Sequence, residues 1–157
     1  MNYNIREIKE NEYKALDDFL YEAIYIPEGV APPPRKIILE DALQVYVKDF
    51  GKHKDDIGIV AECDGKLIGA VWTRIMNDYG HIDDDTPSLA ISLYKEYRGL
   101  GIGTEMMEHM LATLTIRGYK RVSLAVQKAN YAVKMYKKVG LEIVDENEEE
   151  YIMLYKV

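Results

Sequence analysis

The chain has 157 residues, of which 48% are hydrophobic and 30% are charged, as in an ordinary globular protein. This length suffices for a sizeable core, so we expect residues 1–157 to form a single domain. The formal net charge of -7 disfavours wholesale binding to nucleic acid or to an anionic membrane, and suits a cationic small molecule or a basic peptide. The lone cysteine, Cys63, excludes an internal disulfide. No apolar run approaches the length of a membrane span, and the N-terminus resembles no leader, so we expect a cytoplasmic protein.

The first fifty residues predict one strand and two helices. Residues 3–8 indicate a short strand. Asn11 could cap a helix over residues 13–24, where apolar residues recur at helical spacing. A second, shorter helix is predicted over residues 39–50, with Gly51 as its end.

The segment between these helices is rich in proline, from Pro27 to Pro34. It is either a stiff surface connector or a wall of a binding pocket, because long loops often carry function. In the second interpretation Tyr25, Ile26 and Arg35 offer contacts to a ligand.

A hairpin and a polar loop are predicted next. Strands over residues 57–61 and 66–76 flank the two-residue turn Asp64-Gly65. Trp72, on the second of these strands, is expected to be a core aromatic. The loop over residues 77–85 holds one histidine, His81, and several aspartates.

The remaining chain alternates strands and helices. Strands are predicted over residues 88–94 and 121–126, with a helix from Ile102 to Gly118 between them. One stripe of that helix is apolar and rich in methionine, and we expect it to be core: Ile102, Met106, Met107, Met110, Leu111 and Leu114. A short helix over residues 131–139 starts after Asn130, and a hairpin of residues 141–145 and 151–155 closes the chain.

These elements predict a mixed α/β fold in which helices cover both faces of a central, mostly antiparallel sheet. The closing hairpin could present an edge to a second copy of the chain, which makes a homodimer possible.

The run Arg98-Gly99-Leu100-Gly101-Ile102-Gly103-Thr104 joins the strand over residues 88–94 to the long helix. A helix N-terminus has unpaired backbone N–H groups and partial positive charge, and glycines let a ligand approach them. The run therefore predicts a phosphate site, to which Arg98 adds a cation. The alternative is a plain tight turn. A dinucleotide fingerprint would need glycine where Thr104 stands, and no Walker sequence is present.

Arg98-x-x-Gly101-x-Gly103 after a strand resembles the pyrophosphate motif of the GNAT superfamily of acyl-CoA-dependent N-acetyltransferases. The downstream run from Asn130 to Leu141 is similar to the second signature of that superfamily. The resemblance implies a sheet that splays open between its fourth and fifth strands, over residues 88–94 and 121–126. Acetyl-CoA would be the cofactor in that opening.

The resemblance also implies site residues. Backbone N–H groups of Gly99 to Thr104 would bind the pyrophosphate, and the strand edge at Ile91, Ser92 and Leu93 would pair with the pantetheine arm. Asn130 could contact the cofactor, cap its helix, or do both. Tyr136 would protonate the leaving thiolate, although its place on an apolar stripe also fits a core aromatic.

The resemblance identifies no general base in this chain, because Pro87 and Ser88 stand where some members of the superfamily have a glutamate. Asp85 is the candidate base, and a water chain is the alternative. The predicted function is acetyl transfer from acetyl-CoA to a primary amine of a small molecule or peptide. Its candidate acceptor contacts are Tyr25, Ile26, Arg35 and His81. The alternative is a non-catalytic acyl-CoA sensor, and no metal is expected.

Overall fold

The computed structural model describes all residues from 1 to 157, and its seven strands form one sheet. The strand order is β1-β2-β3-β4-β5-β7-β6. The strands are β1 (Tyr3–Glu7), β2 (Ile57–Cys63), β3 (Lys66–Arg74), β4 (Ser88–Leu93), β5 (Arg121–Gln127), β6 (Glu142–Glu146) and β7 (Glu150–Lys156). All neighbours pair antiparallel except β4 and β5, which are parallel, so the predicted mixed, mostly antiparallel sheet is confirmed.

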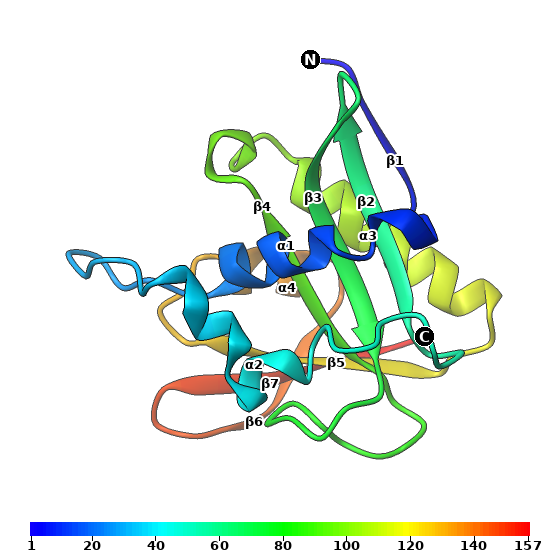
Figure 1. The fold of residues 1–157 in the computed structure, drawn as a ribbon. Helices are drawn as coiled ribbons and strands as arrows, with labels where there is room; N and C mark the ends of the chain where they lie inside the picture. The colour runs from blue at the N-terminus through cyan, green and yellow to red at the C-terminus, as the bar shows by residue number, and fades with distance from the viewer.

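Helices lie on both faces of this sheet, as predicted. Helix α1 (Ala15–Ala23) packs on β3 and β4 from one face, and α3 (Ile102–Ile116) packs on β2, β3 and β4 from the other (Figure 1). The other helices are α2 (Asp41–Gln44) and α4 (Ala132–Lys138), with 3-10 turns η1 (Glu10–Glu12), η2 (Arg35–Leu39) and η3 (Lys95–Tyr97). None of the helices is long and apolar enough to cross a membrane.

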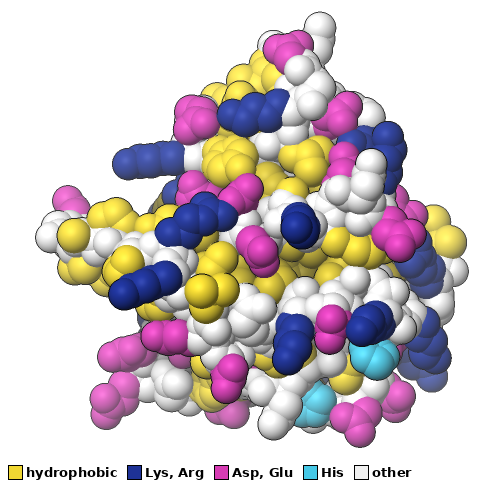
Figure 2. Space-filling view, in the orientation of Figure 1, with side chains coloured by type: hydrophobic (Ala, Val, Ile, Leu, Met, Phe, Trp, Pro, Cys, Tyr) yellow, Lys and Arg dark blue, Asp and Glu magenta, His cyan; other side chains and the backbone are white.

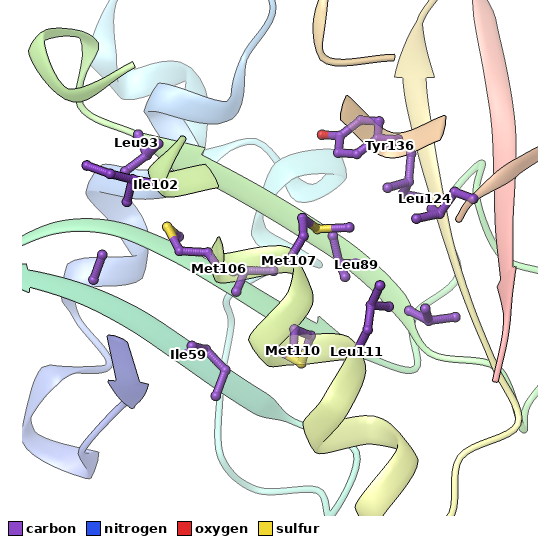
Figure 3. Close-up of a cluster of buried hydrophobic side chains, with 14 of the residues drawn as sticks. Ile59, Leu89, Leu93, Ile102, Met106, Met107, Met110, Leu111, Leu124 and Tyr136 are labelled. Atoms are coloured by element: carbon purple, nitrogen blue, oxygen red, sulfur yellow. The ribbon is translucent and has the colours of Figure 1, made fainter. Parts of the chain in front are cut away.

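The larger core lies on the α3 face of the sheet. The predicted methionine-rich stripe of α3 is confirmed, since all six of its residues are buried there (Figure 3). They pack against strand residues such as Ile59, Leu89 and Leu124, and α4 adds Val133 and Tyr136.

The smaller core lies on the α1 face. Trp72 is fully buried there with Leu16 and Phe19, which confirms the prediction for the tryptophan. Its indole Nε1 donates a hydrogen bond to the Tyr46 carbonyl at 3.0 Å, so a large apolar side chain is buried without leaving its donor unpaired.

The sheet divides between β4 and β5. Six residue pairs join β3 to β4 and seven join β5 to β7, but Ser88 and Ser123 are the only pair in the register of β4 and β5. The amide of Ser123 donates to the Pro87 carbonyl at 3.0 Å at the same place. The predicted splay is therefore confirmed, and the two strands form a V whose apex is the Ser88–Ser123 pair.

Two helix predictions need correction. Asn11 caps no helix, because it lies inside η1, and α1 begins only at Ala15. The helix predicted over residues 39–50 is α-helical only from Asp41 to Gln44. The chain then continues in tighter turns, in which the amides of Tyr46 and Val47 bond three residues back.

Arg74 accounts for this tight winding. Its Nη1 donates to the carbonyls of Val45 and Lys48 at 3.2 and 2.9 Å, and its Nε and Nη2 bind both oxygens of Asp56. Both charged side chains are buried, at 7% and 1% exposure. The guanidinium thus holds the segment after α2 against the end of β3.

We predict that Arg74→Met destabilises the protein by about 3–5 kcal/mol, because it leaves the Asp56 carboxylate buried without its cation. Arg117→Met is the matched control, since the Arg117–Glu7 pair is exposed and should contribute no more than about 1 kcal/mol. Urea denaturation followed by circular dichroism measures both. Equal losses in the two variants would contradict this role for Arg74.

Candidate active site

The glycine-rich run lies at the wide end of the V, between the end of β4 and α3. Gly99 and Gly101 have φ of +77° and +86°, a left-handed conformation that other residues rarely adopt. Apart from the glycine itself and its two chain neighbours, no residue comes within 4 Å of the point where a Cβ would stand at Gly99 or at Gly101. The turn is therefore strained for any other residue and open to a ligand.

None of the backbone N–H groups from Gly99 to Thr104 donates a hydrogen bond within the protein, and no side chain caps α3. The first bond of the helix runs from the Glu105 amide to the Gly101 carbonyl at 3.2 Å. Six consecutive donors, with the positive end of a 15-residue helix, are suited to bind an anion through the main chain.

Arg98, the cation predicted to assist the phosphate site, is held beside the glycine run by two main-chain carbonyls. Its Nε donates to the Leu93 carbonyl at 2.9 Å, and its Nη2 donates to the Glu22 carbonyl at 3.2 Å. The guanidinium also lies 3.9 Å from the Glu22 carboxylate. Arg98 therefore ties the glycine run to the ends of β4 and α1.

The edge of β4 that faces the opening has unpaired backbone groups. Backbone groups of alternate strand residues point to the same side. Because the Pro87 carbonyl faces β5, the backbone groups of Leu89, Ile91 and Leu93 face it too. The register gives Ile91 and Leu93 no strand partner there, and only the Leu93 carbonyl is used, by Arg98. The backbone groups of Ser92 point to the other side, toward β3. Its side-chain Oγ donates to the Phe19 carbonyl at 2.6 Å.

Tyr136 lies on α4, beside the opening. Its side chain is 7% exposed and belongs to the larger core, and its hydroxyl points away from Leu124 (Figure 3). The hydroxyl has no hydrogen-bond partner within the protein. Burial, with a smaller effect of Tyr131, raises the pKa of the Tyr136 phenol. The side chain is thus a core aromatic whose phenol keeps its proton.

Asn130 caps α4, as its position predicted. Its Oδ1 accepts a hydrogen bond from the Ala132 amide at 2.9 Å. Helix α4 is also close to the start of α3, since a Cβ at Gly103 would lie 3.8 Å from Met135 Cε and 3.6 Å from Leu93 Cδ1. The two signature runs of the sequence are therefore brought together across the opening.

The predicted acceptor contacts Tyr25, Ile26 and Arg35 stand at the two ends of the proline-rich segment. The segment projects from the body of the molecule after α1 (Figure 1), and Tyr25 and Ile26 are half-buried at its base. Arg35 forms an ion pair with Asp18, and its guanidinium lies 5.8 Å from the Tyr21 ring centre. Arg35 therefore anchors the return of this segment to α1.

The structure does not bring Asp85 into the opening. Asp85 borders a surface hollow of about 620 Å³ with Arg117 and Lys120, at the far end of α3 from the glycines. His81 lies with its Nε2 3.6 Å from Asp84 Oδ1 on the same loop.

A different carboxylate of this loop, Asp78, lies at the apex of the V. Sequence reasoning missed it because its hydroxyl partners, Tyr46 and Ser88, come from distant parts of the chain. No spacing in the sequence joins these three residues.

Charged side chains of both signs cover the face that carries α1 and α2 (Figure 2). Carboxylates gather toward β6, an exposed edge strand of sequence Glu-Ile-Val-Asp-Glu. Pairing of this edge with a second copy remains a prediction.

Comparison with known proteins identifies a family. The sequence profile of the acetyltransferase (GNAT) family matches residues 20–141. An acetyltransferase of Pectobacterium atrosepticum is 32% identical over 95 residues, which cover 59% of this chain and 62% of that protein. A probable N-acetyltransferase of Drosophila melanogaster is 37% identical over 87 residues, which cover 54% of this chain and 46% of that protein. The chain thus aligns with less than two thirds of the length of these relatives.

Solved structures share the fold. The PaiA N-acetyltransferase of Thermoplasma acidophilum, solved in complex with coenzyme A, has a TM-score of 0.74 at 19% identity, with full coverage of both chains. The ribosomal-protein-S18-alanine N-acetyltransferase of Escherichia coli has a TM-score of 0.69 at 17% identity, covering 99% of this chain and 94% of that one. With the profile match over most of its length, the chain belongs to the GNAT family of acetyltransferases.

Proposed function

We propose that residues 1–157 act as one domain that transfers an acetyl group from acetyl-CoA to a primary amine of a small molecule or peptide. The observation that carries this proposal is the run of six free backbone N–H groups from Gly99 to Thr104 at the wide end of the V. The family relationship and the coenzyme A in the Thermoplasma acidophilum structure support it.

The residues present fit this cofactor. The free N–H groups of the glycine run suit a pyrophosphate, and the open space at Gly99 and Gly101 lets it approach. The unpaired β4 edge at Ile91 offers main-chain hydrogen bonds to an amide-containing arm, in the manner of an added strand. These contacts come from the main chain, so they depend on fold rather than on side-chain identity.

Bound acetyl-CoA would supply an acetyl thioester for direct attack by an uncharged amine in the ternary complex. The new N–C bond would form as the C–S bond breaks, and the nitrogen would release one proton to water. We assign the proton that the sulfur gains to the Tyr136 hydroxyl, which has no partner within the protein and is free to donate. It regains its proton from solvent after each turnover.

The alternative function is an acyl-CoA sensor that binds the cofactor without transferring its acetyl group. This alternative is favoured by Pro87 and Ser88, because they stand where some members of the superfamily have a glutamate that acts as the general base. Turnover separates the two functions directly.

We predict that the purified protein releases free thiol from acetyl-CoA with at least one amine of a panel containing spermidine, kanamycin, lysine amide and a lysine-containing peptide. Tyr136→Phe should lower kcat by about 100-fold or more and leave acetyl-CoA binding unchanged, because only the proton donor is lost. Calorimetry measures the binding. Undiminished kcat in the variant would return Tyr136 to a packing role, and tight binding without turnover would favour the sensor.

We predict a pH profile without a basic limb below about pH 10, the ordinary pKa of a tyrosine. Burial raises the pKa of Tyr136, so its phenol keeps its proton through this range. The acceptor amine loses its proton as pH rises, so kcat/KM should increase with pH. A fall of kcat above about pH 8, where a free cysteine-like thiol would ionise, would point to a different donor.

We predict that Asn130→Ala lowers the free energy of unfolding by about 1 kcal/mol through loss of the α4 cap. Asn130→Asp keeps a capping oxygen and should retain most of this stability. Thermal denaturation measures both variants, and calorimetry with acetyl-CoA tests the cofactor contact. If Asn130→Asp keeps its stability but binds acetyl-CoA more weakly, Asn130 contacts the cofactor. A loss of stability in Asn130→Asp as large as in Asn130→Ala would contradict the capping role.

A further inference from the structure

The carboxylate of Asp78 lies where the two halves of the sheet meet. Ser88 Oγ donates a hydrogen bond to Asp78 Oδ1 at 3.0 Å. Ser88 is also the residue that pairs with Ser123 across β4 and β5, and this pair is the apex of the V. Asp78 is therefore held at the apex itself.

The side-chain pattern of β4 shows on which face Asp78 lies. Ser88 and Ser92 point to the α1 face, where Ser92 Oγ donates to the Phe19 carbonyl of α1. Leu89 and Leu93 point to the opposite face and join the core under α3. Asp78 thus approaches the V from the α1 face, and its other oxygen accepts a hydrogen bond from the Tyr46 hydroxyl at 3.2 Å, just after α2.

The charge of Asp78 is not neutralised by the protein. Both partners are neutral hydroxyls, whereas Asp56 and Asp83 each pair with an arginine. Burial and the Asp78 carboxylate raise the pKa of Tyr46, so that phenol keeps its proton and its hydrogen bond. A carboxylate has about four acceptor positions, of which the two hydroxyls use two. Asp78 is half-buried and retains capacity for another donor.

The two faces of the V have different fillings. The larger core, with Tyr136 of α4, fills the α3 face. On the α1 face the loop that carries Asp78 and Gly80 packs over the apex, where the Ser123 hydroxyl donates to the Gly80 carbonyl. An amine that attacks a thioester lying along the β4 edge would approach from the α1 face, beside this loop. Asp78 is the carboxylate fixed to β4 on that approach.

We propose that Asp78 binds the acceptor, accepting a hydrogen bond from its amine or ammonium group and orienting the nitrogen at the apex of the V. This inference rests on the proposed acetyl transfer and adds the residue that selects a nitrogen acceptor. Ser88 and Tyr46 act as positioning residues that hold the carboxylate. Asp85, on the same loop, lies beside Arg117 and Lys120 and has no part in this site.

Steady-state kinetics of Asp78→Asn, with the best amine of the panel, tests the inference. The amide keeps the size of the side chain and removes its charge. Because a hydrogen bond to a charged group is worth about 1.5–3 kcal/mol, KM for the amine should rise by about 10-fold to 150-fold. KM for acetyl-CoA should stay within about 2-fold, since its contacts are main-chain groups elsewhere in the V.

Asp85→Asn is the matched control, because it removes a carboxylate from the same loop, and it should leave both KM values unchanged. Tyr46→Phe separates charge from packing: it removes a hydrogen bond to Asp78 but leaves the charge, so its KM for the amine should lie closer to that of the native protein. A KM for the amine unchanged in Asp78→Asn overturns the inference. A rise shared equally by both substrates, or matched by Tyr46→Phe, also overturns it by showing a structural role.

A binding measurement keeps this test independent of turnover. Calorimetry titrates each amine of the panel into native protein saturated with coenzyme A, and then into Asp78→Asn. If the native protein transfers no acetyl group, weaker amine binding by the variant still supports Asp78 while the proposed function fails. Equal binding by both proteins, or no amine binding by the native protein, overturns the inference.

Discussion

The opening of this structure depends on the pairing of β4 and β5 at one residue pair, Ser88 and Ser123. Parallel strands that paired along their full length would satisfy each other's backbone groups, but here the pairing stops at Ser88 and Ser123. The edge beyond Ser88 is left with main-chain donors and acceptors that no neighbouring strand satisfies. Such an edge is a liability in most proteins, and it persists here inside a V that the proposed cofactor would fill.

The V stays open because each half of the sheet is held by its own partners. Helices α1 and α3 clamp β4 from opposite faces, and Arg98 fixes its end to α1. On β5, α4 packs from one side, while the backbone of Gly80 lies against Leu124 and Ala125. Ser123 Oγ also donates to the Gly80 carbonyl at 2.7 Å. The opening is thus a consequence of packing on both strands.

The sequence predicted the features that depend on local patterns. Strand alternation, the α3 stripe and the glycine run were readable because period and turn chemistry are properties of neighbouring residues. The opening between β4 and β5 was predicted only from the family resemblance. The short α2 was not readable, because Arg74, some 30 residues further along the chain, determines its winding. Asp78 was missed for the same reason, since its significance lies in Tyr46 and Ser88.

Amide hydrogen exchange at the β4 edge tests the central claim most directly. The account predicts that the amides of Ile91 and Leu93, with those from Gly99 to Thr104, exchange fast in the free protein because they have no partner. Saturating coenzyme A should slow them strongly, while amides already paired between β2 and β3 change little. Exchange at Ile91, Leu93 and the glycine run that is the same with and without coenzyme A would contradict the account.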